Sequence, residues 1–331
     1  MPTRETFLER LARADRRPIL ADSATGTWFQ ERVKDEAGTC CDGYNLANPD
    51  VVRQMYREKI EAGAELVLTN TFNSSELRLP EFGLEGNGDR LNAEGVRLLR
   101  QAMADAGRTC FIGGDVGPSG LVIGDTGTYP QVRDGFVEQI RSLVRAGADL
   151  ICVETLLQAL EGQAAAEAAH EAFAKEGVTL PLYITCVFTD LVPGQSEHRT
   201  FFGDTVEEML DGKEDELAQQ RFDGLLALGA TVIGANCSVG LGDVIPIAAR
   251  FRQGIDARGF GGKVFVAAKP NSAVMSSQSF EGPDVAAARL PELVKSGAHI
   301  IGYCCGSRPE HIKVTAEGLD ALAASDACVT R

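Results

Sequence analysis

Short apolar runs alternate with longer amphipathic stretches along the whole chain. The apolar runs show little strict alternation with polar residues, a pattern typical of strands that are covered on both faces. They predict eight strands, at 18–22, 65–70, 110–115, 149–154, 182–187, 231–236, 263–268 and 299–303. The amphipathic stretches between them predict helices at 50–62, 90–106, 132–146, 158–175, 243–253 and 284–296.

Glycine stands where several of these helices should end, which suits the left-handed backbone that commonly terminates a helix. The positions are Gly63, Gly107, Gly147, Gly177, Gly229 and Gly297. The order helix, glycine, strand therefore recurs, but its spacing varies too much for a solenoid repeat. Eight strands that alternate with helices predict an α/β fold, a single (β/α)8 TIM-type barrel.

No stretch rich in proline or serine divides the chain, so residues 1–331 are predicted to form one barrel domain. The segment 188–223 is longer than a connection between a strand and a helix requires. It contains a helix-like part at 204–211 and is predicted to form a lid or rim over the functional site.

Composition and charge narrow the classes of function. The net charge of −15 argues against a nucleic-acid partner, because phosphates would be repelled. No apolar run is long enough to cross a bilayer, and the charged N-terminal stretch lacks the apolar centre of a signal peptide. We therefore expect a cytoplasmic protein with no membrane partner. In that reducing compartment, the nine cysteines are expected to be thiols or metal ligands rather than disulfides.

Three of the cysteines follow predicted strands directly. Cys237 ends the run TVIGANC, and Cys304 and Cys305 end HIIGYCC. In a barrel these are the carboxyl-terminal ends of the sixth and eighth strands, the face that carries the chemistry of such enzymes. Three thiolates suit Zn²⁺ and leave its fourth tetrahedral position open, as in catalytic sites. The alternative is that all three are small buried hydrophobic residues.

The other cysteines give weaker signals. Cys40 and Cys41 form a second pair, next to Asp42 in AGTCCDGYN, and compete as a metal site. The remaining four are predicted to lie in the core or in the C-terminal tail: Cys110, Cys152, Cys186 and Cys328.

Polar residues stand at most of the other predicted strand ends, which indicates a polar mouth. Asp22 begins the turn DSATGT, whose amide groups could face a carboxylate. Glu154 ends the fourth strand, where it could hold a substrate ammonium or simply interact with a helix N-terminus. Further polar ends are Asn70, Thr71 and Asn73, Asp115 with Ser119, and Asn236 and Asn271.

Lys269, in VAAKPN at the end of the seventh predicted strand, supports a competing hypothesis. A buried lysine with a lowered pKa can form a Schiff base, which would make the chain a lyase. None of the four histidines has metal-ligand spacing, and no phosphate-binding loop, dinucleotide fingerprint or catalytic triad signature is present.

Two motifs together resemble a known family. GANCSVG (234–240) and GYCCGSRPEHI (302–312) resemble the paired zinc signature of the homocysteine S-methyltransferases. DSATGT (22–27), YREKIEAGAELVLTNTFNSS (56–75), GDVGPSG (114–120) and AGADLICVET (146–155) resemble further segments of that family in the same order. The resemblance covers about residues 18 to 320.

The resemblance implies a (β/α)8 barrel and specific site residues. Cys237, Cys304 and Cys305 would bind zinc and serve the catalysis. Glu154 would receive the substrate amino group, Asp22 and Ser23 would belong to the amino-acid-binding loop, and Asn271 could fill the open position on zinc. Thr71 and Phe72 would line the pocket.

Within the family, GYNLANPDVV (43–52) is most similar to the homocysteine module of cobalamin-dependent methionine synthases. The chain lacks a cobalamin-binding DxHxxG signature, so a separate corrinoid protein could supply the methyl group, as could a sulfonium or quaternary ammonium compound. The implied reaction is zinc-dependent methylation of a small thiol, homocysteine to methionine.

Three departures from the family pattern surround the expected pocket: Ser23, Tyr303 and the AAKPNSA stretch that contains Lys269. A different thiol, or demethylation with a corrinoid partner, therefore stays open. A non-catalytic zinc- or thiol-binding partner of a corrinoid protein is the remaining alternative.

Overall fold

The computed structural model describes residues 5–13, 17–34, 39–124, 128–191, 195–274 and 278–325. Eight parallel strands form its central sheet, in the order β1-β12-β9-β8-β5-β4-β3-β2. An isolated parallel bridge between Ala21 and Leu66 joins the two edges and leaves the barrel nearly closed. The strands are β1 (Ile19–Leu20), β2 (Leu66–Leu68), β3 (Phe111–Val116), β4 (Leu150–Leu156), β5 (Leu182–Cys186), β8 (Val232–Asn236), β9 (Phe265–Lys269) and β12 (Ile300–Ile301).

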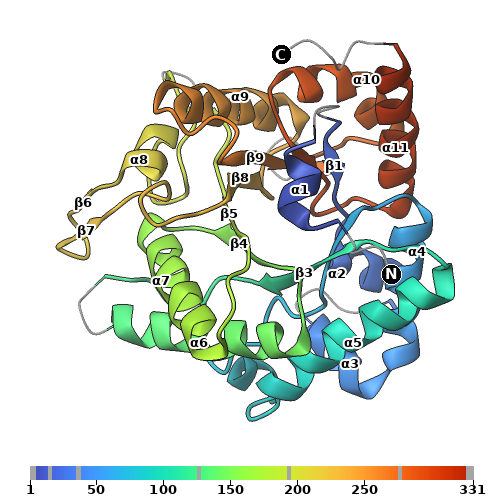
Figure 1. The fold of residues 1–331 in the computed structure, drawn as a ribbon, viewed down its shortest axis with the longest axis horizontal. Helices are drawn as coiled ribbons and strands as arrows, with labels where there is room; N and C mark the ends of the chain where they lie inside the picture. The colour runs from blue at the N-terminus through green and yellow to red at the C-terminus, as the bar shows by residue number, and fades with distance from the viewer. Residues whose placement is uncertain are drawn as a thin grey trace.

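Helices surround this barrel (Figure 1). They are α1 (Phe7–Leu11), α2 (Thr25–Arg32), α3 (Tyr44–Ala47), α4 (Pro49–Glu61), α5 (Gly88–Ala106), α6 (Thr128–Ala146), α7 (Ala159–Glu176), α8 (Val206–Asp211), α9 (Leu241–Ala257), α10 (Pro283–Lys295) and α11 (Pro309–Ala324), with 3-10 turns at Cys41–Gly43 and Leu79–Phe82. Two antiparallel hairpins complete the described chain, β6 (Lys213–Asp215) with β7 (Gln220–Phe222) and β10 (Ala273–Val274) with β11 (Ser279–Phe280).

The predicted (β/α)8 TIM-type barrel is confirmed, and each of the eight expected strands and six expected helices is present. The six glycines expected to end helices all have positive φ. Four helices of the described chain were not predicted: α1, α2, α3 and α11. The segment of α2 contains Thr25, Gly26 and Thr27, which have low helix propensity, and it forms because Trp28 and Phe29 bury their rings. The helix α11 begins at Pro309, a favoured first residue of a helix.

Successive side chains of each strand point to opposite faces, which gives the barrel two apolar layers. In β4, Leu150 and Cys152 belong to the inner layer, whereas Ile151 and Val153 pack against the surrounding helices. In β9, Phe265 and Ala267 point inward in the same way. Continuing this alternation places the residues at the carboxyl ends of these strands in the lumen.

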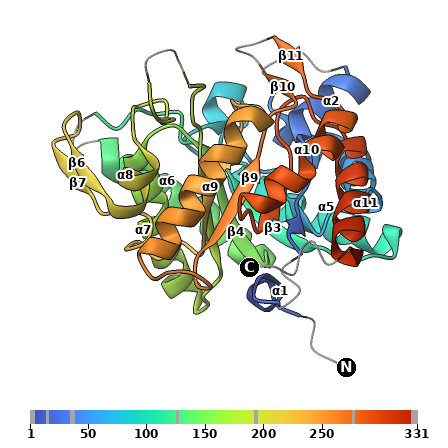
Figure 2. The ribbon, with the colours of Figure 1, turned by 90° about the horizontal axis from the view of Figure 1, so that it is seen from above.

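The helix α1 covers one end of the barrel and the hairpin of β10 and β11 lies at the opposite end (Figure 2). Phe7 and Leu11 of α1 pack into the inner apolar layer, and the Phe7 ring meets that of Phe111 edge to face, 5.4 Å between centroids. The inner layer is therefore closed by apolar contacts at the α1 end, and space remains at the end where the strands finish.

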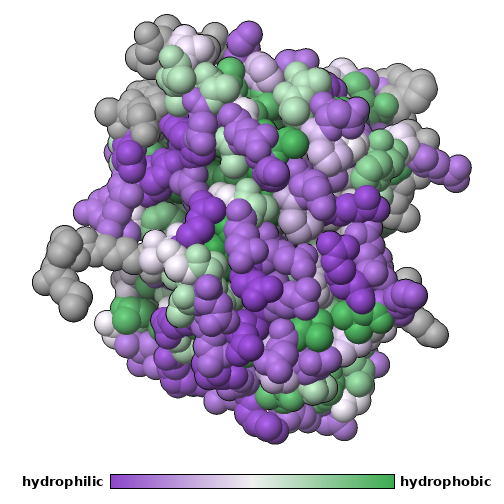
Figure 3. Space-filling model, turned by 90° about the vertical axis from the view of Figure 1, so that its right-hand side faces the viewer, coloured by the Kyte–Doolittle hydropathy of each residue, from purple (hydrophilic) through white to green (hydrophobic). Residues whose placement is uncertain are grey.

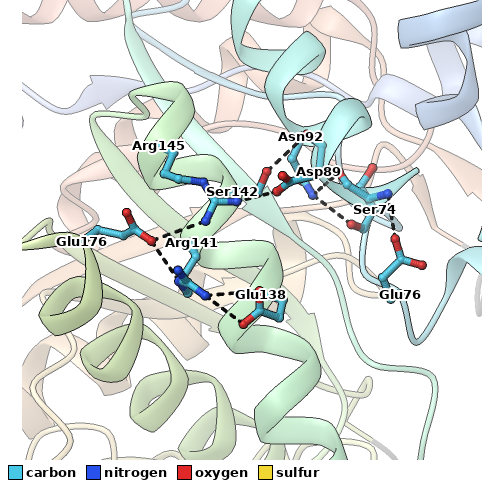
Figure 4. Close-up of polar contacts among 10 residues, drawn as sticks. Ser74, Glu76, Asp89, Asn92, Glu138, Arg141, Ser142, Arg145 and Glu176 are labelled. Carbon is cyan, nitrogen blue, oxygen red and sulfur yellow. Dashed lines mark hydrogen bonds and ion pairs between the residues drawn. The ribbon is translucent and has the colours of Figure 1, made fainter. Parts of the chain in front are cut away.

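The outer helices are joined by ion pairs between neighbours. Arg145 of α6 reaches Asp89 of α5 and Glu176 of α7, and Arg141 of α6 also pairs with Glu176 (Figure 4). The face shown in Figure 3 is mainly hydrophilic, with hydrophobic side chains in small separate patches. Among the helices of the described residues, none is both long and apolar enough to cross a membrane.

Candidate active site

A cavity of about 600 Å³ opens at the carboxyl ends of the strands. Residues in or directly after seven of the eight barrel strands line it, as does the start of α2. Two groups of side chains dominate its chemistry. The thiol cluster consists of Cys237, Cys304 and Cys305, and the lysine–carboxylate cluster consists of Asp22, Lys59, Glu154 and Lys269.

The thiol cluster brings together three sulfur atoms that all lie within 4.8 Å of one another. The Sγ atoms of Cys237 and Cys305 are 3.7 Å apart. Tetrahedral zinc with Zn–S distances of ~2.3 Å requires sulfur atoms roughly 3.8 Å apart, so this spacing fits the ion. Within the described residues, this is the one group of three or more acidic, histidine or cysteine side chains close enough to hold a metal ion.

The backbone holds the three cysteines in place after the ends of β8 and β12, the two strands that flank β9. Cys237 and Ser238, with φ of 61° and 62°, turn the chain sharply after β8. The amide of Cys237 donates to the carbonyl of Lys269, and the amide of Cys304 donates to the carbonyl of Pro270. Gly306 follows with φ of 83°, and a Cβ there would lie 2.4 Å from the backbone nitrogen of Ala273. Only glycine fits at this position.

Three members of the lysine–carboxylate cluster, Asp22, Glu154 and Lys269, line the same cavity. Lys269 Nζ donates to Glu154 Oε2 at 3.0 Å and lies 3.6 Å from Asp22 Oδ1. Lys59 Nζ, from α4, donates to Asp22 Oδ2 at 2.9 Å and to Thr25 Oγ1 at 2.8 Å. The four charged residues are buried, with 0% of Lys59 and 3% of Lys269 exposed. Both carboxylates are therefore already paired with protein cations.

These pairs determine the state of Lys269. Burial alone would lower its pKa, but the carboxylates of Glu154 and Asp22 outweigh burial and raise the pKa well above its ordinary value. A Schiff-base lysine needs a lowered pKa to be nucleophilic at neutral pH. The geometry therefore contradicts the lyase hypothesis that the sequence left open.

Two further carboxyl groups line the cavity without a lysine partner. Burial raises the pKa of Asp42 to about 6, although its Oδ2 accepts from the Asn73 amide and the Ser74 hydroxyl. Burial and the nearby Glu154 raise the pKa of Asp115 well above its usual range. The surroundings of both groups disfavour their charged forms.

The first residues of α2 face the cavity with unpaired backbone donors. Thr25, Gly26 and Thr27 all line it, and the amides of a first helical turn have no partner within the helix. The Ser23 hydroxyl, buried beside them, has no hydrogen-bond partner among the described residues. Together with the dipole of the helix, these donors favour an anionic group.

The other expected site residues have different surroundings. Phe72 lines the cavity, as do Asp22, Ser23 and Glu154. Thr71 does not: its hydroxyl donates to the carbonyl of Asp115 behind the wall. Asn271 is buried near the thiol cluster, where its backbone N–H donates to the carbonyl of Val239, but it is not among the residues that line the cavity.

Cys40 and Cys41 do not form a second metal site among the described residues. Cys41 lines the cavity, but no third ligand joins the pair, and the Asp42 side chain is held by Asn73 and Ser74. Burial, followed by repulsion from Asp42, raises the pKa of Cys40 to about 12, which favours its protonated form.

Sequence reasoning missed Lys59, which is central to the lysine–carboxylate cluster. A signal was present, because the buried positions of α4 are Val52, Met55, Tyr56, Lys59 and Ile60, and a lysine there interrupts an apolar stripe. Asn236 of β8 and Thr155 of β4 also pair, although β5 lies between their strands, with Asn236 Nδ2 donating to Thr155 Oγ1 at 2.8 Å. This pair fixes Thr155, whose φ is 66°.

The segment 188–223 packs on the outside of the barrel. Its described residues form α8 and the β6–β7 hairpin, which contact α9 and α7 respectively. None of its described residues is among those that line the cavity. Its role as a lid or rim stays a prediction.

Fold and site together define a (β/α)8 barrel with a candidate three-thiol metal site at its catalytic end. A model of the family described as homocysteine S-methyltransferase matches residues 19–319. The chain belongs to this family and is a methyltransferase.

Solved structures agree with this fold. The homocysteine methyltransferase MmuM from Escherichia coli, in its metallated form, is 21% identical with a TM-score of 0.65, over 91% of this chain and 96% of that one. Its oxidized form, also 21% identical and with a TM-score of 0.65, matches over 90% of this chain and 94% of that one. A methyltransferase from Methanosarcina mazei is 13% identical with a TM-score of 0.57, over 96% and 99% of the two chains.

Proposed function

We propose that this protein is a zinc-dependent thiol S-methyltransferase in which Cys237, Cys304 and Cys305 hold the metal. The observation that carries the proposal is the thiol cluster at the mouth of the cavity, with its sulfur atoms within 4.8 Å of one another. When bound, zinc would supply an open coordination position at which a substrate thiol loses its proton and stays nucleophilic. The existence of a metallated form of the E. coli homocysteine methyltransferase, which shares this fold, supports the proposal of a metal.

The residues of the chain would orient the acceptor. The amides of Thr25, Gly26 and Thr27 and the Ser23 hydroxyl would bind a carboxylate of the acceptor, and Phe72 would pack against its carbon chain. Fixing both ends of a short thiol directs its sulfur toward an incoming methyl group, which accelerates transfer by orientation. Homocysteine, named in the description of the family, is the reference acceptor.

The proposed reaction is a methyl transfer by displacement. The acceptor sulfur forms a bond to the methyl carbon with a lone pair, the bond from that carbon to the donor breaks, and the leaving group departs with the electron pair. The thiol proton is released to solvent. Donors with suitable leaving groups are a methylcorrinoid on a partner protein, a sulfonium or a quaternary ammonium compound.

The experiment measures metal content, thiol binding and transfer on the same preparation. The purified protein should contain about one zinc per chain, release about one proton when a thiol binds, and methylate that thiol with one donor class among methylcobalamin, a sulfonium and glycine betaine. Protein stripped of zinc with a chelator is the matched control. It should neither release a proton when the thiol is added nor methylate that thiol. Zinc-free protein that methylates thiols at the same rate would overturn the proposal.

A further inference from the structure

The pairing of the carboxylates in the cavity determines whether a thiol with an ammonium group can bind there. An ammonium group enters a buried site favourably only where an unpaired carboxylate or several acceptors receive it. Glu154 and Asp22 both line the cavity, but Lys269 bridges them, 3.0 Å from Glu154 Oε2 and 3.6 Å from Asp22 Oδ1. The position of a substrate ammonium between them is thus already taken by a side chain of the protein.

The second oxygen of Asp22 is also engaged. Lys59 Nζ donates to Asp22 Oδ2 at 2.9 Å, and the Leu68 amide donates to the same oxygen at 3.3 Å. Two lysines therefore balance the two carboxylates, and the cluster carries no net charge. A further cation placed there would lie close to Lys269 and be repelled, because like charges interact strongly in a water-poor cavity.

The remaining carboxyl groups of the cavity do not replace the lost site. Burial, followed by repulsion from Glu154, raises the pKa of Asp115 well above its usual range, and its Oδ1 has no partner among the described residues. Asp42 already accepts two hydrogen bonds at Oδ2 and is only 2% exposed. By contrast, the start of α2 and Ser23 offer several unpaired donors for an anion.

We propose that Lys269 is the built-in counterion of Glu154 and Asp22, and that the acceptor is a sulfanyl carboxylate without an ammonium group. This inference rests on the proposed function, since it assigns the acceptor of the same metal site. The sulfur would reach the thiol cluster, the carboxylate would bind the N-terminus of α2, and the chain between them would pass Lys269 with a hydrogen or hydroxyl where an amino acid carries its ammonium. Lys269 then determines specificity and is not a catalytic residue.

The test uses the intact protein with cobalt in place of zinc, so that a bound thiol changes the visible absorption spectrum without any methyl donor. The probes are homocysteine, 4-sulfanylbutanoate, which lacks only the amino group, and propane-1-thiol, which lacks both charged groups. We expect 4-sulfanylbutanoate to bind at least about tenfold more tightly than homocysteine, and propane-1-thiol to bind more weakly than 4-sulfanylbutanoate. The ammonium of homocysteine makes its thiol more acidic, a bias that works against the expected order.

Two variants separate specificity from general damage. Lys269→Met approximately keeps the length of the side chain and frees Glu154 and the Oδ1 atom of Asp22, while Lys59 still pairs with Asp22 Oδ2. Homocysteine should therefore gain at least about tenfold in affinity relative to 4-sulfanylbutanoate. The double variant Lys269→Met/Glu154→Gln removes the freed carboxylate as well and should lose most of that gain. If Lys269→Met does not fold, the order in which the wild-type protein binds homocysteine and 4-sulfanylbutanoate still tests the proposal. The double variant, which buries one charge fewer than Lys269→Met, provides a second test.

The outcomes distinguish the two proposals. Equal or tighter binding of homocysteine to the wild-type protein would overturn the role of Lys269 and leave the thiol methyltransferase intact. A cobalt spectrum that no thiol changes would overturn both, because then no acceptor reaches the thiol cluster. A preference for 4-sulfanylbutanoate that is reversed by Lys269→Met would support both.

Discussion

The two sides of the cavity achieve their chemistry in opposite ways. The thiol cluster is formed by residues that follow two strands, β8 and β12. Its three cysteines are half-buried or exposed, and they offer ligands for a metal ion. The lysine–carboxylate cluster joins β1, α4, β4 and β9 across the lumen, is buried, and supplies its own counterions. One side is open for a ligand, and the other is already complete.

This difference teaches what each side contributes. The thiol cluster, which lacks a partner, is suited to binding a ligand. The lysine–carboxylate cluster, whose charges are already paired, is suited to excluding further cations and to positioning what binds beside it. We expect the substitution of a cysteine in the thiol cluster to affect folding less, since none of the three takes part in the buried ion pairs. Removing one member of the buried ionic cluster leaves a charge without a partner and should affect the whole fold.

The largest expected effect is on the thiol cluster. Cys304→Ser should lose zinc and reduce methyl transfer by more than about hundredfold, because even residues that only support a metal ligand change metal affinity by about 10- to 100-fold. Metal analysis and activity measured together provide the test. Cys41→Ser, in the same cavity but outside the cluster, is the matched control and should keep its zinc. Wild-type zinc and activity in Cys304→Ser would remove the thiol cluster from the mechanism.

The lysine–carboxylate cluster should instead reveal itself in stability. Lys59→Met leaves Asp22 with one cation fewer and should lower the free energy of unfolding by about 3–5 kcal/mol. Urea unfolding at neutral pH measures this change. Lys175→Met breaks the exposed pair with Glu171 on α7 and should lower the free energy of unfolding much less. Equal losses in the free energy of unfolding of Lys59→Met and Lys175→Met would show that the buried cluster contributes no more to stability than an exposed ion pair.

Asp42 tests what happens to a pocket carboxyl without a cation. Burial raises its pKa in the folded protein to about 6, above the ordinary value of about 3.9 in an unfolded chain. The protonated form therefore favours the fold, and this contribution is lost as the pH rises from about 4 through about 6. The difference corresponds to about 3 kcal/mol.

The measurement is urea unfolding of the wild type and Asp42→Asn at pH 4.5 and 7.5. The wild type should lose stability relative to Asp42→Asn between these two values, because only its carboxyl must ionise in the folded state. Asp50→Asn, at an exposed position of α4, controls for the loss of a carboxyl group. A pH-independent difference between the wild type and Asp42→Asn would contradict the raised pKa.

The smallest effect concerns Ser23. Its hydroxyl has no partner in the described structure, so Ser23→Ala should change the free energy of unfolding by less than about 0.5 kcal/mol. Affinity for a sulfanyl carboxylate should nevertheless fall by about tenfold, the value of one hydrogen bond to a charged group. Thiol titrations of the cobalt protein measure this loss. Unchanged affinity would separate Ser23 from the anion site.

The same comparison explains how far the sequence leads. The strands, the helices of the βα units and the thiol cluster follow from local patterns, because Cys237, Cys304 and Cys305 each stand directly at a strand end. Side-chain alternation could also have placed Lys269 in the lumen, since Phe265 and Ala267 point there.

The pairing of Lys269 with Glu154 could not be predicted in this way. Their strands, β9 and β4, are separated in the sheet by β8 and β5, so the contact crosses the barrel and depends on its diameter and tilt. The start of α2 was read as a turn because its threonines and glycine favour one, and tertiary packing of Trp28 and Phe29 made it a helix.

One contact of Asp22 reaches beyond charge. Between β1 and β2 the barrel is held by little more than the bridge at Ala21 and Leu66, and the Asp22 carboxylate adds a bond from the Leu68 amide at that seam. Asp22, which lines the cavity, therefore also helps to join the two edges of the sheet. If a ligand in the cavity stabilises the junction of β1 and β2, the Leu68 amide should exchange its hydrogen more slowly than in the free protein. Hydrogen exchange at this one amide would then report whether the cavity is occupied.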